Sequence, residues 1–314
     1  VKPETRERKM AVVRKRNYQP TVLERRLEEE RTKILGLIIP YGITVAFQDP
    51  FFPRMIRGVT GACNAHDYSL MLWLAEPEYE RRRIDQILSN GLLDGLIVIA
   101  THLPDEVIDA LQRADLPFVL IGRLADEKRV DVSYVDVENR HGAQNIVIYL
   151  MRLGRRRIAH ITGPLDTMAA IHRKEGYTDA LQLRGRSVDP SLIAEGDFTE
   201  SSGYMAMQTL IEAEPDAVFA GNDLMAMGAI RALRDAGLAV PGDVAVVGFD
   251  DSPSASTATP PLTTMRQPSQ RMGAVATETL IDTIEQGYEL RHRIVLPTQL
   301  IIRASCGSSS RSQG

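Results

Sequence analysis

Polar residues follow several apolar runs of this chain, at the points where buried strands are expected to end. Asn222 follows the run 217–221, Asp250 follows the run 244–249, and Arg173 lies early in the next amphipathic segment after a third run. An amide, a carboxylate and a guanidinium group can each make paired hydrogen bonds to neighbouring hydroxyls. Since none of them resembles a nucleophile with its base, the set predicts binding of a small polyol or another small metabolite, without turnover.

Aromatic residues lie at similar places. Phe51 and Phe52 come soon after the apolar run 34–39, and Phe198 stands in the sequence Gly-Asp-Phe. An aromatic ring can cover the apolar C–H face of a sugar. These rings could also be ordinary core residues, and the sequence leaves that alternative open.

Several of the polar residues also have purely structural interpretations. Asp223 and Asp251 stand where helices are expected to begin, and a carboxylate there commonly caps the helix. Arg173 could be a surface residue of its helix. These readings favour Asn222 and Asp250 over their acidic neighbours as ligand contacts.

Sequence motifs for common enzyme chemistries are absent. The chain has no G-x-S-x-G, G-x-G-x-x-G or P-loop sequence, and no carboxylate pair that stands out as an acid/base dyad. Its 6 histidines are scattered, without ligand spacing or partner cysteines. We therefore expect no catalytic residue, no metal ion and no cofactor.

The polar residues are placed by alternating strands and helices. Strands are expected at 34–39, 69–74, 95–100, 117–122, 157–163, 217–221 and 244–249, with a loop at 44–52 and helices at 53–65, 77–90, 104–113, 139–153, 169–184, 201–213 and 223–236. This alternation predicts an α/β fold with two parallel-sheet modules that join near Gly154. A late helix (269–286) and a final strand (294–302) could belong to either module.

Composition and charge are ordinary for a globular protein, but the charge is unevenly distributed. The chain has 314 residues, is 44% hydrophobic and 25% charged, and carries a net charge of −4. Residues 1–33 hold 11 basic and 6 acidic residues, against 26 and 35 in the remainder. A basic end on an acidic body is typical of a segment that meets a polyanion, although a solvated helix is an alternative. Two distant cysteines and the absence of a signal-peptide core or membrane-length apolar run predict a cytoplasmic protein.

Four segments resemble the LacI/GalR family of bacterial transcription regulators. They are the last headpiece helix (VKPETRERKMAVVRKRNYQP), the hinge helix (VLERRL), the middle motif (ENRHGA with LGRRRIAHITGP) and AGNDLMAMGAIRALRDAGLAVPGDVAVVGFDDS with PPLTTMRQPSQRMG. The resemblance implies two periplasmic-binding-protein-like, Rossmann-like subdomains joined by three crossovers, near Gly154, Gln267 and Tyr288. Its units are a headpiece remnant (1–18), a hinge helix and linker (19–33), an N-terminal subdomain (34–153 and 267–288), a C-terminal subdomain (154–266 and 289–306) and a disordered tail (307–314).

The same resemblance assigns roles to individual residues. It implies a ligand site made of the following residues: Phe51, Phe52, His141, Thr167, Ala169, Arg173, Phe198, Asn222, Asp250 and Gln267. It implies DNA contacts from Tyr18, Arg25, Arg26 and Leu27, with Leu27 as the wedge in the minor groove. It also implies that the chain starts inside the headpiece and lacks the recognition helix. Acidic residues at and after Glu24 oppose contacts with DNA phosphates, which suggests that the hinge helix binds DNA weakly.

We therefore expect a transcriptional regulator, a repressor and homodimer, that binds a sugar between its subdomains and couples this to operator DNA. One alternative is a secreted sugar-binding receptor of a transporter, which has the same fold. Another is an enzyme that acts on the same ligand. The sequence does not identify the effector.

Overall fold

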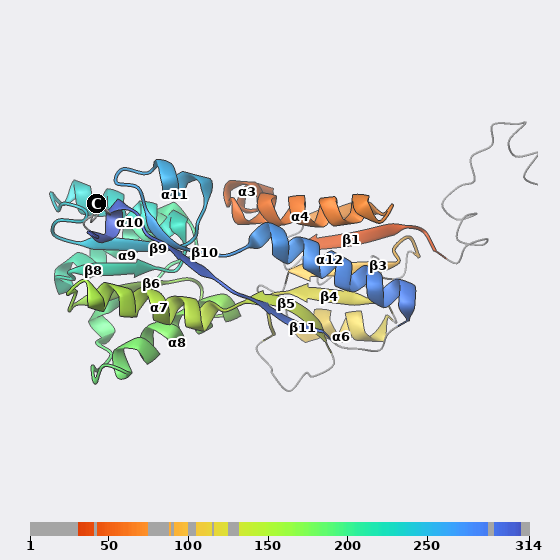
Figure 1. Cartoon of the computed structure of the whole chain (residues 1–314), viewed down its shortest axis with the longest axis horizontal. Coiled ribbons are helices and arrows are strands. Elements are labelled where there is room, and N and C mark those ends of the chain that lie inside the picture. The colour runs from red at the N-terminus through yellow and green to blue at the C-terminus, as the bar shows by residue number, and fades with distance from the viewer. Residues whose placement is uncertain are drawn as a thin grey trace, which may run out of the picture.

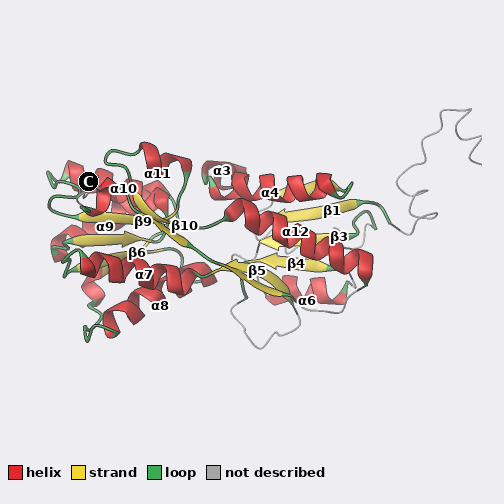
Figure 2. Ribbon diagram, viewed as in Figure 1, coloured by secondary structure: helices red, strands yellow, loops and turns green. Residues whose placement is uncertain are grey.

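The computed structural model has two α/β lobes, one after the other along the long axis (Figure 1). It describes residues 31–40, 43–74, 88, 91–99, 105–114, 116–124, 132–287 and 292–308. Each lobe is a six-stranded sheet with helices on both faces (Figure 2). The predicted α/β class with two parallel-dominated sheets is confirmed.

The N-terminal lobe has the strand order β11-β5-β4-β3-β1-β2, with all pairs parallel. Residues Leu35, Leu37 and Ile39 of β1 pack on one face, whereas Ile38 packs on the other. A strand with both faces buried is typical of a parallel sheet. The elements are β1 (Ile34–Ile39), α3 (Ile43–Gln48), α4 (Phe51–Ala65), β2 (Ser69–Leu74), β3 (Gly95–Ile99), α6 (Asp105–Arg113), β4 (Phe118–Ile121), β5 (Ser133–Val137), α12 (Ser269–Gln286) and β11 (Arg293–Leu296).

The C-terminal lobe has the strand order β12-β10-β9-β8-β6-β7, in which only the β10–β12 pair is antiparallel. Helices α7 and α8 cover one face, and α9 and α10 cover the other. The elements are α7 (Asn139–Arg152), β6 (Ile158–Thr162), α8 (Met168–Gln182), β7 (Ile193–Glu195), α9 (Glu200–Leu210), β8 (Ala217–Ala220), α10 (Asp223–Asp235), β9 (Ala245–Asp250), α11 (Pro253–Thr257), β10 (Thr263–Arg266) and β12 (Gln299–Ile301), with short 3-10 turns at Pro190–Leu192, Ile211–Ala213 and Ala304–Cys306.

The first crossing between the lobes lies at Glu138, so the expected boundary at Gly154 is wrong. Helix α7 packs in the C-terminal lobe, where Ile146 and Leu150 lie in one core with Tyr177. The apolar face of α7 is buried against α8 and not against the N-terminal sheet. The crossing therefore precedes the helix.

The second crossing lies at Gln267, between β10 in one sheet and α12 on the other lobe. The predicted final strand (294–302) is two strands: β11 pairs with β5 and β12 with β10. The third crossing therefore follows Leu296 and does not lie near Tyr288, because β11 continues the N-terminal sheet before the chain changes lobe.

Other differences concern short elements. The expected loop at 44–52 contains helix α3, and strands β5 and β10 were not expected. Sequence SYVDV carries only three apolar residues and TTMR one, so neither resembles the longer apolar runs from which the other strands were predicted.

The linker before β1 is anchored on the end of α12. The Arg31 guanidinium donates to the Ile284 carbonyl (2.9 Å), and Lys33 pairs with Glu285 (2.8 Å). The headpiece remnant (1–18), most of the hinge segment and the predicted DNA contacts Tyr18, Arg25, Arg26 and Leu27 lie outside the described residues, as do 309–314 of the predicted tail. No helix in the described part of the chain could cross a membrane.

Helices α4 and α12 approach closely at Gly58. A Cβ there would lie 1.8 Å from the Gln270 carbonyl oxygen, whereas one at Gly61 of the same helix would meet nothing within 4 Å. We expect Gly58→Ala to lower the free energy of unfolding by about 1–3 kcal/mol, as overpacking does. The matched change Gly61→Ala should raise it by about 0.5–1 kcal/mol, because glycine is entropically costly inside a helix. Urea denaturation of both variants measures this; equal stabilities would contradict the close packing.

Candidate functional site

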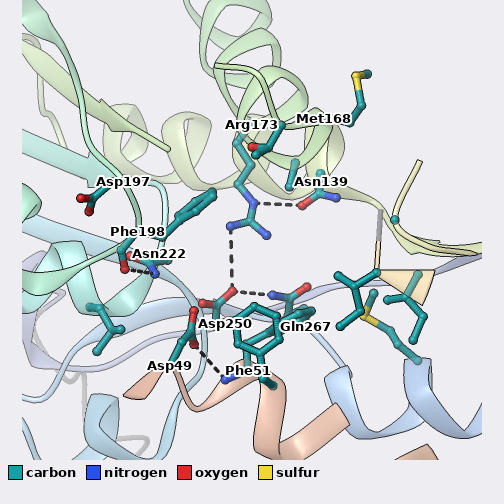
Figure 3. Close-up of a pocket in the computed structure, with 18 of the residues that line it drawn as sticks. Asp49, Phe51, Asn139, Met168, Arg173, Asp197, Phe198, Asn222, Asp250 and Gln267 are labelled. Atoms are coloured by element: carbon teal, nitrogen blue, oxygen red, sulfur yellow. Dashed lines mark hydrogen bonds and ion pairs between the residues drawn. The ribbon is translucent and has the colours of Figure 1, made fainter. Parts of the chain in front are cut away.

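Arg173 lies in the second turn of α8 and is almost fully buried, with 4% of its surface exposed. Its Nε donates to Asn139 Oδ1 (2.9 Å), and its Nη1 donates to the Gly221 carbonyl (2.6 Å). The guanidinium plane lies 3.8 Å from the centre of the Phe249 ring. These contacts fix the orientation of the charge, and Figure 3 shows it directed toward Asp250.

Asp250 ends β9 and faces Arg173, with 3.9 Å between Oδ1 and Nη1. Gln267 at the second crossing donates from Nε2 to the same carboxylate. Burial raises the pKa of Asp250 well above its ordinary value, and the nearby Arg173, which lowers it, does not offset this. A ligand that donates hydrogen bonds to such a carboxyl group favours its ionised form and lowers its pKa.

Asn222 and Asp223 have different tasks at the start of α10. Asn222 is the helix cap: its Oδ1 accepts from the Met225 amide (2.9 Å), and its Nδ2 donates to the Phe198 carbonyl (2.8 Å). Asp223 accepts from the Ser252 amide (2.6 Å) and the Thr264 hydroxyl (2.5 Å), and burial raises its pKa to about 6. Asp223 therefore connects α10 to Ser252 and Thr264 by hydrogen bonds and is not the helix cap that the sequence suggested.

The aromatic residues line the cavity from both lobes. Phe198 has φ +67°, and a Cβ on Gly163 would lie 2.1 Å from its ring, so the ring packs directly on a glycine. Phe51 and Phe52 meet edge to face at 5.3 Å, and the Asp49 carboxylate accepts from the Phe51 amide (2.9 Å). Phe52, only 5% exposed, belongs to the core as well as lining the cavity, which agrees with the alternative that it is a core residue.

These residues surround one cavity of about 340 Å³ between the lobes. Nine of the ten residues expected at the ligand site line it, namely Phe51, Phe52, Thr167, Ala169, Arg173, Phe198, Asn222, Asp250 and Gln267. Two of its lining residues, Phe198 and Asp250 (φ +118°), have a positive φ without being glycine. Such strained backbone persists where the surroundings impose it and is concentrated at functional sites.

His141, the tenth of these residues, does not line this cavity. It is exposed on α7 and lines a neighbouring hollow. Asn139 takes its place: its Nδ2 donates to Asp136 (3.1 Å), and Asp136 accepts from Arg123 (2.7 Å). Two residues along a helix amount to about 200° of rotation, which explains why one side chain enters the cleft and the other faces outward.

Four further residues line the cavity that the family resemblance does not imply as ligand contacts, namely Asp49, Arg123, Asp136 and Asn139. Asp49 was visible as a polar residue after β1, and Asn139 lies inside the ENRHGA segment. Arg123 follows strand β4, and Asp136 lies near the end of strand β5, which was not predicted. Hydrogen bonds connect Arg123, Asp136, Asn139 and Arg173, in that order, into a continuous chain along the first crossing.

A hydrogen bond from Arg54 joins the two lobes beside the cleft. Arg54 Nη1 on α4 donates to the Asp251 carbonyl (2.7 Å), and the Asp251 carboxylate is itself held by Arg266 and Arg303 (2.7 Å each). These two ion pairs lower the pKa of Asp251 and keep it charged. Two ion pairs thus hold Asp251 in place on the C-terminal lobe, and Arg54 on the N-terminal lobe hydrogen-bonds to it.

We expect Arg54→Ala to weaken binding of a cleft ligand by about three- to tenfold, since one hydrogen bond of about 1 kcal/mol that favours the closed cleft is lost. The matched change Arg57→Ala, at an exposed position one turn along α4, should leave affinity unchanged. Titration calorimetry of both variants measures this. Equal affinities for the Arg54 and Arg57 variants would show that the contact does not hold the lobes together.

Within the described residues, no group of acidic, histidine or cysteine side chains could hold a metal ion.

The family model for a periplasmic binding protein-like domain matches residues 147–306. The regulator CelR of Thermobifida fusca is 36% identical over 97% of this chain and 90% of its own length. The ribose operon repressor of Escherichia coli K12 is 35% identical, over 94% and 88%.

The chain belongs to the LacI/GalR family of transcriptional regulators. A solved complex of CelR with cellobiose superposes with a TM-score of 0.85 at 35% identity, over 97% of this chain and 91% of that one. A LacI-family regulatory protein from Chloroflexus aggregans superposes with a TM-score of 0.75 at 29% identity, over 87% and 98%. The relatives are transcription regulators, which does not favour the alternative of a transporter receptor.

Proposed function

We propose that this regulator is a cytoplasmic, homodimeric repressor whose cleft binds an uncharged sugar and transmits that binding to operator DNA. The observation that carries the proposal is the convergence of Arg173, Asn222 and Asp250 on one cavity with the ring of Phe51 opposite (Figure 3). Paired donors and acceptors beside an aromatic face suit a ring with several hydroxyls.

The charges around the cleft support a neutral ligand. Arg173 is the central cation, and Asp250, Asp136 and Asp49 all act on it electrostatically. A ligand with its own negative charge would meet these carboxylates. The relatives agree, since one is solved with cellobiose and another is named for the ribose operon. A site of this kind rejects ligands without hydroxyls, because its buried polar groups would be left unpaired.

Sugar binding would act on DNA through the angle between the lobes. The N-terminal lobe carries the linker at residues 31–33, and the ligand contacts lie on both lobes. A ligand shifts such an equilibrium only if it binds the two lobe arrangements unequally. A coupling of about 1–3 kcal/mol is usual. In this proposal Leu27, Arg25, Arg26 and Tyr18 contact the operator, and no turnover of the sugar occurs.

Two measurements test the proposal. A thermal-shift panel of mono- and disaccharides, nucleosides and purine bases should raise the unfolding temperature for sugars only. The sugar that binds should then change the affinity of the complete regulator for operator DNA by at least fivefold in fluorescence anisotropy. Binding of a sugar without any change in operator affinity would contradict the proposal that the sugar regulates DNA binding. Hydrolysis or modification of the sugar would instead indicate an enzyme.

A further inference from the structure

A second hollow of about 760 Å³ lies beside the cleft, on the α7 and α8 side of the first crossing. We call it the flank groove. Arg123, Asn139 and Met168 line both the groove and the cleft, so the two hollows adjoin at these side chains. Figure 3 shows Asn139 and Met168 on the side of the cleft away from Phe198 and Asp197, which is where the groove begins.

We propose that the flank groove holds the second unit of an uncharged di- or trisaccharide whose first unit lies against Arg173, Asn222 and Asp250. This inference rests on the sugar-binding function proposed above. The groove adjoins the cleft at Asn139 and Met168, which line both hollows, so a ring linked to a sugar in the cleft reaches the groove there.

The groove has the mixed surface that a sugar needs. His141 and Gln144 lie three residues apart on α7 and therefore on one face of it, where they present hydrogen-bonding groups to the groove. Ile171 and Val295 provide an apolar wall, and Val295 is 40% exposed although it is a strand residue. A saccharide ring offers both hydroxyls and an apolar C–H face to such a surface.

The charges of the groove argue against an anionic ligand such as a sugar phosphate. Arg140 is already paired with Glu175 (3.2 Å) and Asp179 (2.6 Å), and Arg123 is paired with Asp136 (2.7 Å). Glu138, exposed at the first crossing, adds a further carboxylate to the lining. The carboxylates outnumber the arginines, so a phosphate group would be repelled.

The test compares each monosaccharide with a disaccharide that contains it by titration calorimetry: glucose with cellobiose, galactose with lactose, xylose with xylobiose, and arabinose with arabinobiose, together with glucose 6-phosphate. We expect one disaccharide to bind at least tenfold more tightly than its monosaccharide. The double variant His141→Ala/Gln144→Ala should weaken that disaccharide about five- to tenfold and its monosaccharide less than twofold, since the lost hydrogen bonds serve only the second ring. Arg152→Ala, at an exposed position near the end of the same helix, is the matched control and should change neither.

Three outcomes would overturn the inference. A monosaccharide that binds as tightly as its disaccharide, or a double variant that weakens both equally, shows that the groove is not a sugar subsite. Glucose 6-phosphate as the tightest ligand shows that the groove is an anion site. In each case sugar binding in the cleft stands. If none of these probes binds and the thermal-shift panel finds no sugar that binds, the proposed function fails together with the inference.

Discussion

Replacing Arg173 by alanine is expected to weaken sugar binding by about 3 kcal/mol or more, which is over a hundredfold in Kd. The guanidinium group is buried, directed by Asn139 and Gly221, and stacked on Phe249, so its remaining donors face the cleft without rearrangement. The loss also leaves Asp250 without its cationic neighbour. Titration calorimetry with the sugar selected by the thermal-shift panel measures the effect.

Two further variants separate binding from folding. Arg231 on α10 is also stacked on a ring, that of Tyr204, and ion-paired, but it is half exposed on the outer surface. Arg231→Ala should therefore keep the parent's affinity. Arg173→Lys keeps the charge but loses the fork that holds two partners, and we expect it to bind weakly. If Arg173→Ala binds within a few-fold of the parent while remaining folded by circular dichroism, the cleft is not the ligand site.

The second large effect is expected at Asp250. Asp250→Asn keeps the shape, can still accept a hydrogen bond from Gln267, and tolerates the positive φ of this position. It removes the charge that ligand hydroxyls would hydrogen-bond to. Hydrogen bonds to charged groups contribute about 1.5–3 kcal/mol, so we expect a loss of affinity of about tenfold to a hundredfold.

Asp250 also predicts how affinity depends on pH. Its pKa is raised in the unliganded cleft by burial, with Asp223 and Asp49 acting in the same direction and Arg173 against them. Hydroxyl donors stabilise the ionised form, so the ligand lowers this pKa and binding releases a proton. Affinity should therefore rise with pH from the ordinary aspartate range up to the raised pKa, and level off above it.

Calorimetry over about pH 5 to 8, in two buffers of different ionisation enthalpy, counts the released protons. The Asp250→Asn variant should lose most of the pH dependence. An affinity that falls with rising pH, or a pH dependence that persists unchanged in the variant, would contradict the role assigned to this carboxylate.

Much of the site could be predicted because strand ends are visible in the sequence. The long apolar runs before Asn222 and Asp250 fixed the ends of β8 and β9 closely, and parallel strands bring their carboxyl ends to one edge. Arg173 was different: its place early in the helix after an apolar run made it a candidate, but nothing in that helix distinguishes it from a surface residue, and the family resemblance decided in its favour. Its burial follows from contacts with Asn139 and Gly221, distant in sequence.

The sequence predictions were wrong where tertiary contacts decide which lobe an element joins or which side chain enters the cleft. Helix α7 has an apolar face that either lobe could bury, and only its packing on Ile158 and Tyr177 assigns it to the C-terminal lobe. His141 and Asn139 are both polar residues of the same helix turn, so the sequence alone could not say which enters the cleft. Strand β5 is held by neighbours on both sides rather than by its own composition, and Asp136 was missed with it.

The most direct test of this account is a crystal structure of the regulator with the sugar that the panel selects. The account predicts that the first sugar ring lies between the lobes, with its hydroxyls within hydrogen-bonding distance of Arg173, Asn222 and Asp250 and one face on an aromatic ring. A ligand found outside this cleft, or one in the cleft without a contact to any of these three side chains, would contradict it.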